Sequence, residues 1–140
     1  MTRQGPTRRA DDTFGAGRLE NARSFHELAE QALTLAAPGQ NANPILSLVV
    51  SSAIGYADAV CSLYGGRVNQ DDHDAAPKTL RAVLGNQLPP DQLKRFRRIL
   101  AQKDQAQYGA RWARLEAAQE RMEDLRQFAE WAMEMMANRR

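Results

Sequence analysis

Arg67 and His73 are two residues whose types and spacing fit RNA cleavage, with five residues between them. A histidine can accept the proton of an RNA 2′-hydroxyl, and an arginine can stabilise the charge that develops on the phosphorus centre. Three neighbouring carboxylates would repel a phosphate, those of Asp71, Asp72 and Asp74. A two-residue pattern also arises easily by chance. The alternative interpretation is therefore that His73 caps or positions a helix.

A run of cations is the second candidate site. Between positions 94 and 114, seven basic residues accompany a single acidic one, although the whole chain has a net charge of only +2. Such a run suits contacts with phosphates, and nearby aromatic rings can stack on bases. The alternative is an ordinary solvated face balanced by acidic residues elsewhere. The candidate binding residues are Lys94, Arg95, Arg97, Arg98, Lys103, Tyr108 and Arg111, with Trp112 and Arg114 beside them.

Asp58 is a carboxylate within the most apolar stretch of the chain, residues 45–64. A lone charge in such a place is costly unless it is paired. We interpret it either as a structural hydrogen-bonding group or as part of a polar cleft with His73 or the basic helix. His26 has polar neighbours, which predicts a solvated side chain. The aspartates near His73 lack the spacing of an EF-hand, and the single Cys61 allows no CxxC zinc site. We therefore predict neither a metal site nor a cofactor.

Helices are expected to position all of these residues, and no strand is predicted. Apolar residues at steps of three and four, Phe25 and Leu28 among them, predict an amphipathic helix over about 19–36. The same steps recur from Leu115 to Met136. Between these helices the sequence predicts an apolar helix over 43–64, a short helix over 74–84 and a basic helix that begins near 89. The expected fold is all-α, an antiparallel bundle of four to five helices, with a flexible tail over 1–17 and one domain over 18–140.

The apolar stretch over residues 45–64 approaches the length of a membrane span, but it contains Asp58 and several serines. We therefore predict a buried central helix and no membrane partner. The N-terminal segment lacks the apolar core of a signal peptide, and a single cysteine fits a reducing compartment. These features predict a cytoplasmic location.

Three segments carry a resemblance to a known family: the central helix SSAIGYADAVCSLYGG, the loop QDDHDAAPKTL, and KDQAQYG before a long C-terminal helix. Their order, over about residues 43–137, resembles the HEPN superfamily (higher eukaryotes and prokaryotes nucleotide-binding). The similarity is to small bacterial members encoded beside minimal nucleotidyltransferases. The resemblance implies a helical bundle, a homodimer and a nucleotidyltransferase-type partner protein. It also implies functions that range from RNA cleavage to nucleotide binding and toxin–antitoxin pairing.

Active HEPN ribonucleases carry an arginine and a histidine, with four to six residues between them, usually near the start of the last long helix. At that junction this sequence has Lys103 and Tyr108, and no histidine follows. We therefore expect a catalytically degenerate binding module for a nucleotide, a nucleic acid or a partner protein. One alternative is a metal-independent RNase toxin that uses Arg67 and His73. Another is a structural or assembly protein that uses the wide apolar stripe of the last helix, which includes Phe128, Trp131 and Met135.

Overall fold

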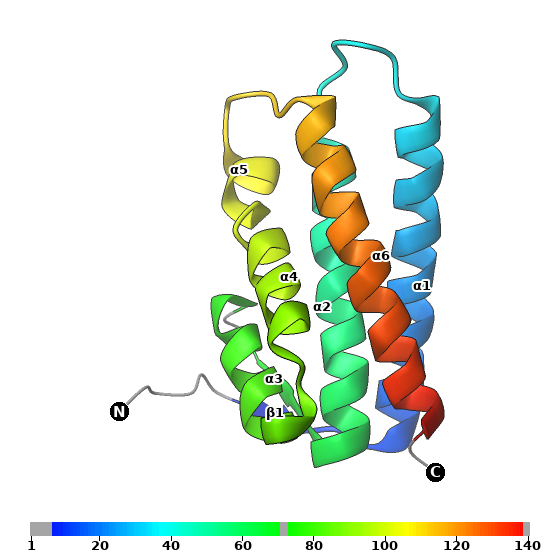
Figure 1. Cartoon of the computed structure of the whole chain (residues 1–140), viewed down its shortest axis with the longest axis vertical. Helices are drawn as coiled ribbons and strands as arrows, with labels where there is room; N and C mark the ends of the chain where they lie inside the picture. The colour runs from blue at the N-terminus through cyan, green and yellow to red at the C-terminus, as the bar shows by residue number, and fades with distance from the viewer. Residues whose placement is uncertain (1–6, 71–72, 139–140) are drawn as a thin grey trace.

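Helices make up most of the computed structural model, which describes residues 7–70 and 73–138 (Figure 1). Helices α1 and α4 run in one direction, and α2 and α6 run in the other, so the all-α class is confirmed and the long helices form an antiparallel bundle. Single turns of 3₁₀ helix precede and follow α3. The elements are β1 (Thr7–Arg9), α1 (Asp12–Leu35), α2 (Asn43–Gly65), β2 (Arg67–Asn69), α3 (Ala76–Leu84), α4 (Pro90–Leu100), α5 (Lys103–Tyr108) and α6 (Leu115–Asn138).

Local sequence signals explain where most helices begin and end. The side chain of Asp11 accepts a hydrogen bond of 2.8 Å from the backbone N–H of Phe14, which caps the start of α1. Pro44 lies in the first turn of α2, where its missing N–H costs nothing. Gly66 and Gly85 end α2 and α3 with φ angles of 63° and 55°, a region that favours glycine.

The core surrounds α2, whose side chains are buried on most sides. Gly55 lets α1 approach closely, since a Cβ at this position would lie 2.9 Å from the Cβ of Ala22. On the other side, the rings of Phe96 and Phe128 stack with centroids 4.9 Å apart and join α4 to α6. Trp131 is buried beside them and Met135 packs partly buried against the same core, so most of this second apolar stripe of α6 lies inside the bundle.

Helix α2 also has the length and hydropathy of a membrane span. However, 78% of its apolar window is buried inside the bundle. Core helices commonly pass such a test, so this helix is only weak evidence for a membrane.

The N-terminal segment differs from the flexible tail expected over 1–17, and the prediction of no strand was wrong. Residues 7–9 form strand β1, which pairs antiparallel with β2 so that Arg8 lies opposite Val68. The hydroxyl of Ser62 donates a 2.8 Å hydrogen bond to the carbonyl of Asp11, which ties the start of α1 to α2. A three-residue polar strand has no periodicity of its own, and its partner is distant in the sequence. Residues 1–6 lie outside the described part of the chain.

Candidate nucleic-acid interface

The seven predicted binding residues belong to α4, α5 and the loop before α6, which together form one edge of the bundle (Figure 1). Helix α4 alone extends about 16 Å at 1.5 Å per residue. Most of its cations are exposed, while Phe96, Ile99 and Leu100 face the core. We define the basic edge as the cations of this region that have no acidic partner on another helix among the described residues: Arg81, Lys94, Arg95, Arg97, Lys103, Arg111 and Arg114.

An open groove between α3 and α4 brings three of these cations together. Arg81, Lys94 and Arg97 line a cavity of about 530 Å³, and no carboxylate contributes to its lining. None of the three forms an ion pair with any residue that the structure describes. Three unpaired cations around one hollow attract anions. Sequence reasoning missed Arg81, whose only signal was its place in the last turn before Gly85.

Arg98 has a different role from the one expected. Its guanidinium donates two hydrogen bonds to Asp124 on α6, from Nη2 at 2.7 Å and from Nε at 3.1 Å. Asp124 is buried, and Arg121 Nε lies 2.9 Å from its Oδ2 atom. The hydrogen bond with Asp124 raises the pKa of Arg98. Arg98 therefore connects α4 to α6, and its charge is neutralised within the fold.

Two exposed aromatic rings stand at the α5 end of the basic edge. Tyr108 is 77% exposed and Trp112 is 66% exposed, which is unusual for side chains of this size. Lys103 Nζ lies 5.7 Å from the centroid of the Tyr108 ring, within the range of a cation–π contact. Exposed rings beside cations can stack on the bases of a single strand whose phosphates the cations bind.

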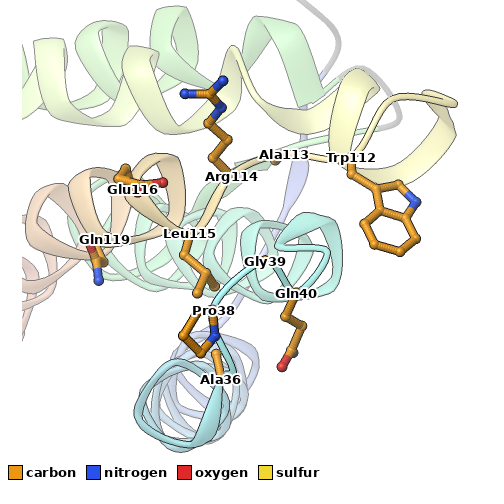
Figure 2. Close-up of a pocket in the computed structure, with 10 residues that line it drawn as sticks. All are labelled: Ala36, Pro38, Gly39, Gln40, Trp112, Ala113, Arg114, Leu115, Glu116 and Gln119. Atoms are coloured by element: carbon orange, nitrogen blue, oxygen red, sulfur yellow. The ribbon is translucent and has the colours of Figure 1, made fainter.

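The loop that carries Trp112 is held in place by buried Asn43. The Asn43 amide donates to the carbonyl of Arg111 at 2.9 Å and accepts from the backbone N–H of Ala113 at 3.2 Å. The amide of Gln105 donates to the same Arg111 carbonyl. Figure 2 shows the indole of Trp112 and the guanidinium of Arg114 leaving this loop in different directions, beside a cavity of about 630 Å³. Hydrogen bonds therefore hold the loop that carries Trp112. We call Tyr108 and Trp112 together the aromatic platform.

Asp58 is paired, but its partner comes from α1. Arg18 Nε donates to Asp58 Oδ2 at 3.1 Å, and the carboxylate is largely buried. Burial raises the pKa of Asp58, while the nearby charges of Arg18, His73 and Arg8 act in the opposite direction. In the described part of the chain, no ion pair or hydrogen bond joins Asp58 to His73 or to the basic helix.

Arg67 and His73 are both exposed, Arg67 on β2 and His73 at the 3₁₀ turn before α3. Arg67 lies opposite Arg9 of β1, and no hydrogen bond joins it to His73 in the described part of the chain. The predicted pair of Arg67 and His73 is therefore not in contact. The charge of His73 acts instead to lower the pKa of Asp58. Asp71 and Asp72 lie outside the described residues.

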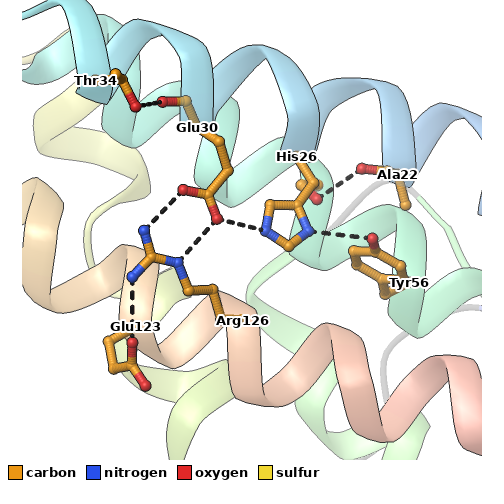
Figure 3. A network of polar contacts seen from close by, with 8 residues as sticks. Ala22, His26, Glu30, Thr34, Tyr56, Glu123 and Arg126 are labelled. Atoms are coloured by element: carbon orange, nitrogen blue, oxygen red, sulfur yellow. Dashed lines mark hydrogen bonds and ion pairs between the residues drawn. The ribbon is translucent and has the colours of Figure 1, made fainter.

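His26 is not the solvated residue that its neighbours suggested. Its Nδ1 atom lies 3.3 Å from the Tyr56 hydroxyl, and its Nε2 atom lies 3.3 Å from Glu30 Oε2 (Figure 3). Arg126 of α6 then binds Glu30 through two hydrogen bonds of 2.8 and 2.7 Å. The i,i+4 spacing of His26 and Glu30 was the only signal of this network in the sequence.

Within the described ranges, no group of three His, Cys, Asp or Glu side chains could hold a metal ion. No model of a known protein family matches the sequence, and no curated protein matches it either. The case for a function therefore rests on the geometry and the charges of the chain itself.

Proposed function

We propose that this protein binds single-stranded nucleic acid along the basic edge. The observation that carries the proposal is the position of two exposed aromatic rings, Tyr108 and Trp112, beside cations that have no acidic partner on another helix. Phosphates would contact the cations, and bases would stack on the rings. Stacking tolerates any base, so the binding would depend weakly on sequence.

The route of the strand follows from the order of the elements. The groove with Arg81, Lys94 and Arg97 would hold phosphates at one end of α4. Lys103 and Tyr108 on α5 continue the same edge, and Trp112 follows on the anchored loop (Figure 1). Together α4 and α5 extend roughly 25 Å, a length that suits a site of several nucleotides.

We further propose that the bundle is HEPN-like and acts as a cytoplasmic, catalytically degenerate binding module. The support is the resemblance of the central helix and of the junction around Lys103 and Tyr108, which has no histidine. A homodimer and a nucleotidyltransferase-type partner belong to the same proposal. The alternative of a metal-independent RNase toxin would use Arg67 and His73, which are both exposed. Cleavage of RNA that is lost in His73→Ala would support that alternative.

Fluorescence anisotropy with a labelled oligouridine RNA of about 16 nucleotides tests the binding proposal. The variant Lys94→Gln/Arg97→Gln should bind about tenfold more weakly, and its log–log salt slope between about 50 and 200 mM should be smaller by about 1.4, since each single-strand phosphate contact contributes about 0.7. The control Arg9→Gln/Arg23→Gln makes the same charge change on exposed residues elsewhere and should stay within about twofold of the unchanged protein.

Equal losses in the two variants would mean that net charge alone attracts the RNA. Absence of binding at the lowest salt would contradict the proposal outright. Gel analysis of the same samples, without metal, reports any cleavage.

A further inference from the structure

Acidic residues gather on the helices away from the basic edge. Helix α1 carries four acidic residues and two arginines, and α6 carries six acidic residues and two arginines. These two helices lie side by side and are joined by the bonds between Glu30 and Arg126 (Figures 1 and 3). Both helices therefore carry a net negative charge, and their residues take no part in the proposed nucleic-acid site.

An open groove lies between α1 and α6. Two cavities of about 460 and 490 Å³ meet there and share His26, Tyr56 and Met133 in their linings. Ala129 and Ala137 extend the apolar lining along α6, and Met133 is 40% exposed. We call this feature the acidic groove. An exposed methionine between two helices is a common element of surfaces that receive a partner's apolar side chains.

Hydrogen bonds beneath the acidic groove hold the side chains of α1, α2 and α6 in place. His26 links the Tyr56 hydroxyl to Glu30, and Glu30 binds Arg126, whose guanidinium also donates to Glu123 at 3.3 Å (Figure 3). These bonds raise the pKa of Arg126 and lower that of Glu30, so both stay charged and neutralise each other. Neither charge is therefore available to a ligand.

The charges that remain on the rim are predominantly negative. Glu27 on α1 and Glu130 and Glu134 on α6 line the groove, and none of the three forms an ion pair with a described residue. Arg23 is the cation that opposes them on the α1 side. The groove thus combines an apolar floor with a net negative rim, the complement of a helix that has an apolar face and basic flanks.

We propose that the acidic groove docks a cationic amphipathic helix of a partner protein. The lining of the groove on α6, residues 126–137, extends about 18 Å, which accommodates about three turns of a helix. Its open shape suits a helix laid into it, whereas small organic ligands are usually enclosed on most of their surface. The occupant would insert apolar side chains beside Met133 and place lysines or arginines opposite Glu27, Glu130 and Glu134. The proposal uses none of the residues of the nucleic-acid site.

A direct test uses two labelled peptides with the same leucine positions, one built on repeated LKKLLKL heptads and the other on LEELLEL heptads. The lysine peptide should bind the full chain, and Glu27→Gln/Glu130→Gln/Glu134→Gln should weaken that binding at least tenfold. The control Glu20→Gln/Glu116→Gln/Glu120→Gln removes the same charge outside the groove and should change it less than twofold. Met133→Ser should weaken binding about fivefold without changing the melting temperature.

Equal binding of the two peptides would overturn the proposal, because apolar contact alone would then explain it. Equal losses in the two triple variants, or no binding of the lysine peptide, would overturn it as well. Oligouridine binding should be unchanged in the groove variant, so this test and the nucleic-acid test can fail independently.

Discussion

Charged residues have opposite roles along the basic edge and in the hydrogen-bond network beneath the acidic groove. In the groove, Arg126 is bound by two carboxylates, and its charge holds α1 and α6 together. Along the edge, Lys94 and Arg97 have no acidic partner among the described residues, and aromatic rings stand exposed nearby. Paired charges in this protein build the fold, whereas unpaired charges mark the surfaces that remain available for ligands.

Helix α4 shows the same division between neighbouring residues. Arg97 lines the open groove toward α3, while Arg98 is bound to Asp124 of α6. The sequence places both in one basic run and gives no means of separating them. Position around the helix, rather than residue type, decides which arginine is structural.

The largest effect should follow removal of the aromatic platform. In Tyr108→Ala/Trp112→Ala, each lost stacking interaction should cost about 1–3 kcal/mol of RNA-binding free energy, so anisotropy should show affinity lower by tenfold or more. Both side chains are exposed, so the melting temperature should not change. Trp112→Phe is the matched control and should keep most of the affinity. Full affinity in the double alanine variant would remove the platform from the site.

A smaller effect is expected from Asp124→Asn. This variant tests whether the charge of Arg98 stabilises the fold or binds RNA. Loss of the charge-assisted bonds to Arg98 should lower the free energy of unfolding by about 1–3 kcal/mol, measured by urea denaturation. RNA affinity should stay within twofold, because Arg98 does not belong to the basic edge. Glu134→Gln serves as the control, because it removes one acidic charge from α6 at a residue that has no ion pair in the described part of the chain. A large gain in RNA affinity on freeing Arg98 would place it among the binding residues instead.

The smallest effect concerns pH and the link beneath the acidic groove. Arg126 lowers the pKa of Glu30 from its ordinary value of 4.5, chiefly through its hydrogen bonds. The Glu30–Arg126 pair therefore stabilises the folded protein fully above pH 4.5, and this stabilisation is lost as the pH falls through the lowered pKa of Glu30. Arg126→Gln should destabilise the protein above pH 4.5, and the difference from the unchanged protein should shrink at lower pH. In the control Arg23→Gln, the difference in stability from the unchanged protein should not shrink at low pH. A difference for Arg126→Gln that stays constant with pH would contradict the role given to the Glu30–Arg126 pair.

Much of the fold was predictable because its signals are local. Pro44 and Gly85 mark ends of helices, and the steps of three and four in residues 115–136 give α6 its correct start. The basic edge was also largely predictable, since a run of cations on a surface helix has few other places to lie. The predicted short helix differs from α3 only at its first residues, which form a 3₁₀ turn.

The remaining features depend on contacts between distant segments. Phe25 and Leu28 belong to the apolar pattern that predicts α1, yet Leu28 is 51% exposed, and α1 packs through the small residues Ala22 and Ala29. Close packing against Gly55 selects the alanine face, and no periodicity within α1 reveals that choice. Strand β1, the pairing of Asp58 with Arg18 and the contact of His26 with Tyr56 were missed for the same reason.

Photo-crosslinking of a 4-thiouridine-substituted RNA, followed by mass spectrometry of the attached peptides, tests the division between the two surfaces most directly. The nucleic-acid proposal predicts crosslinks to Tyr108 and Trp112 and to peptides of α4, with no crosslinks in the acidic groove. Competition with unlabelled RNA should remove them. Crosslinks concentrated on α1 and on residues 126–137 of α6, or spread evenly over the whole chain, would contradict it.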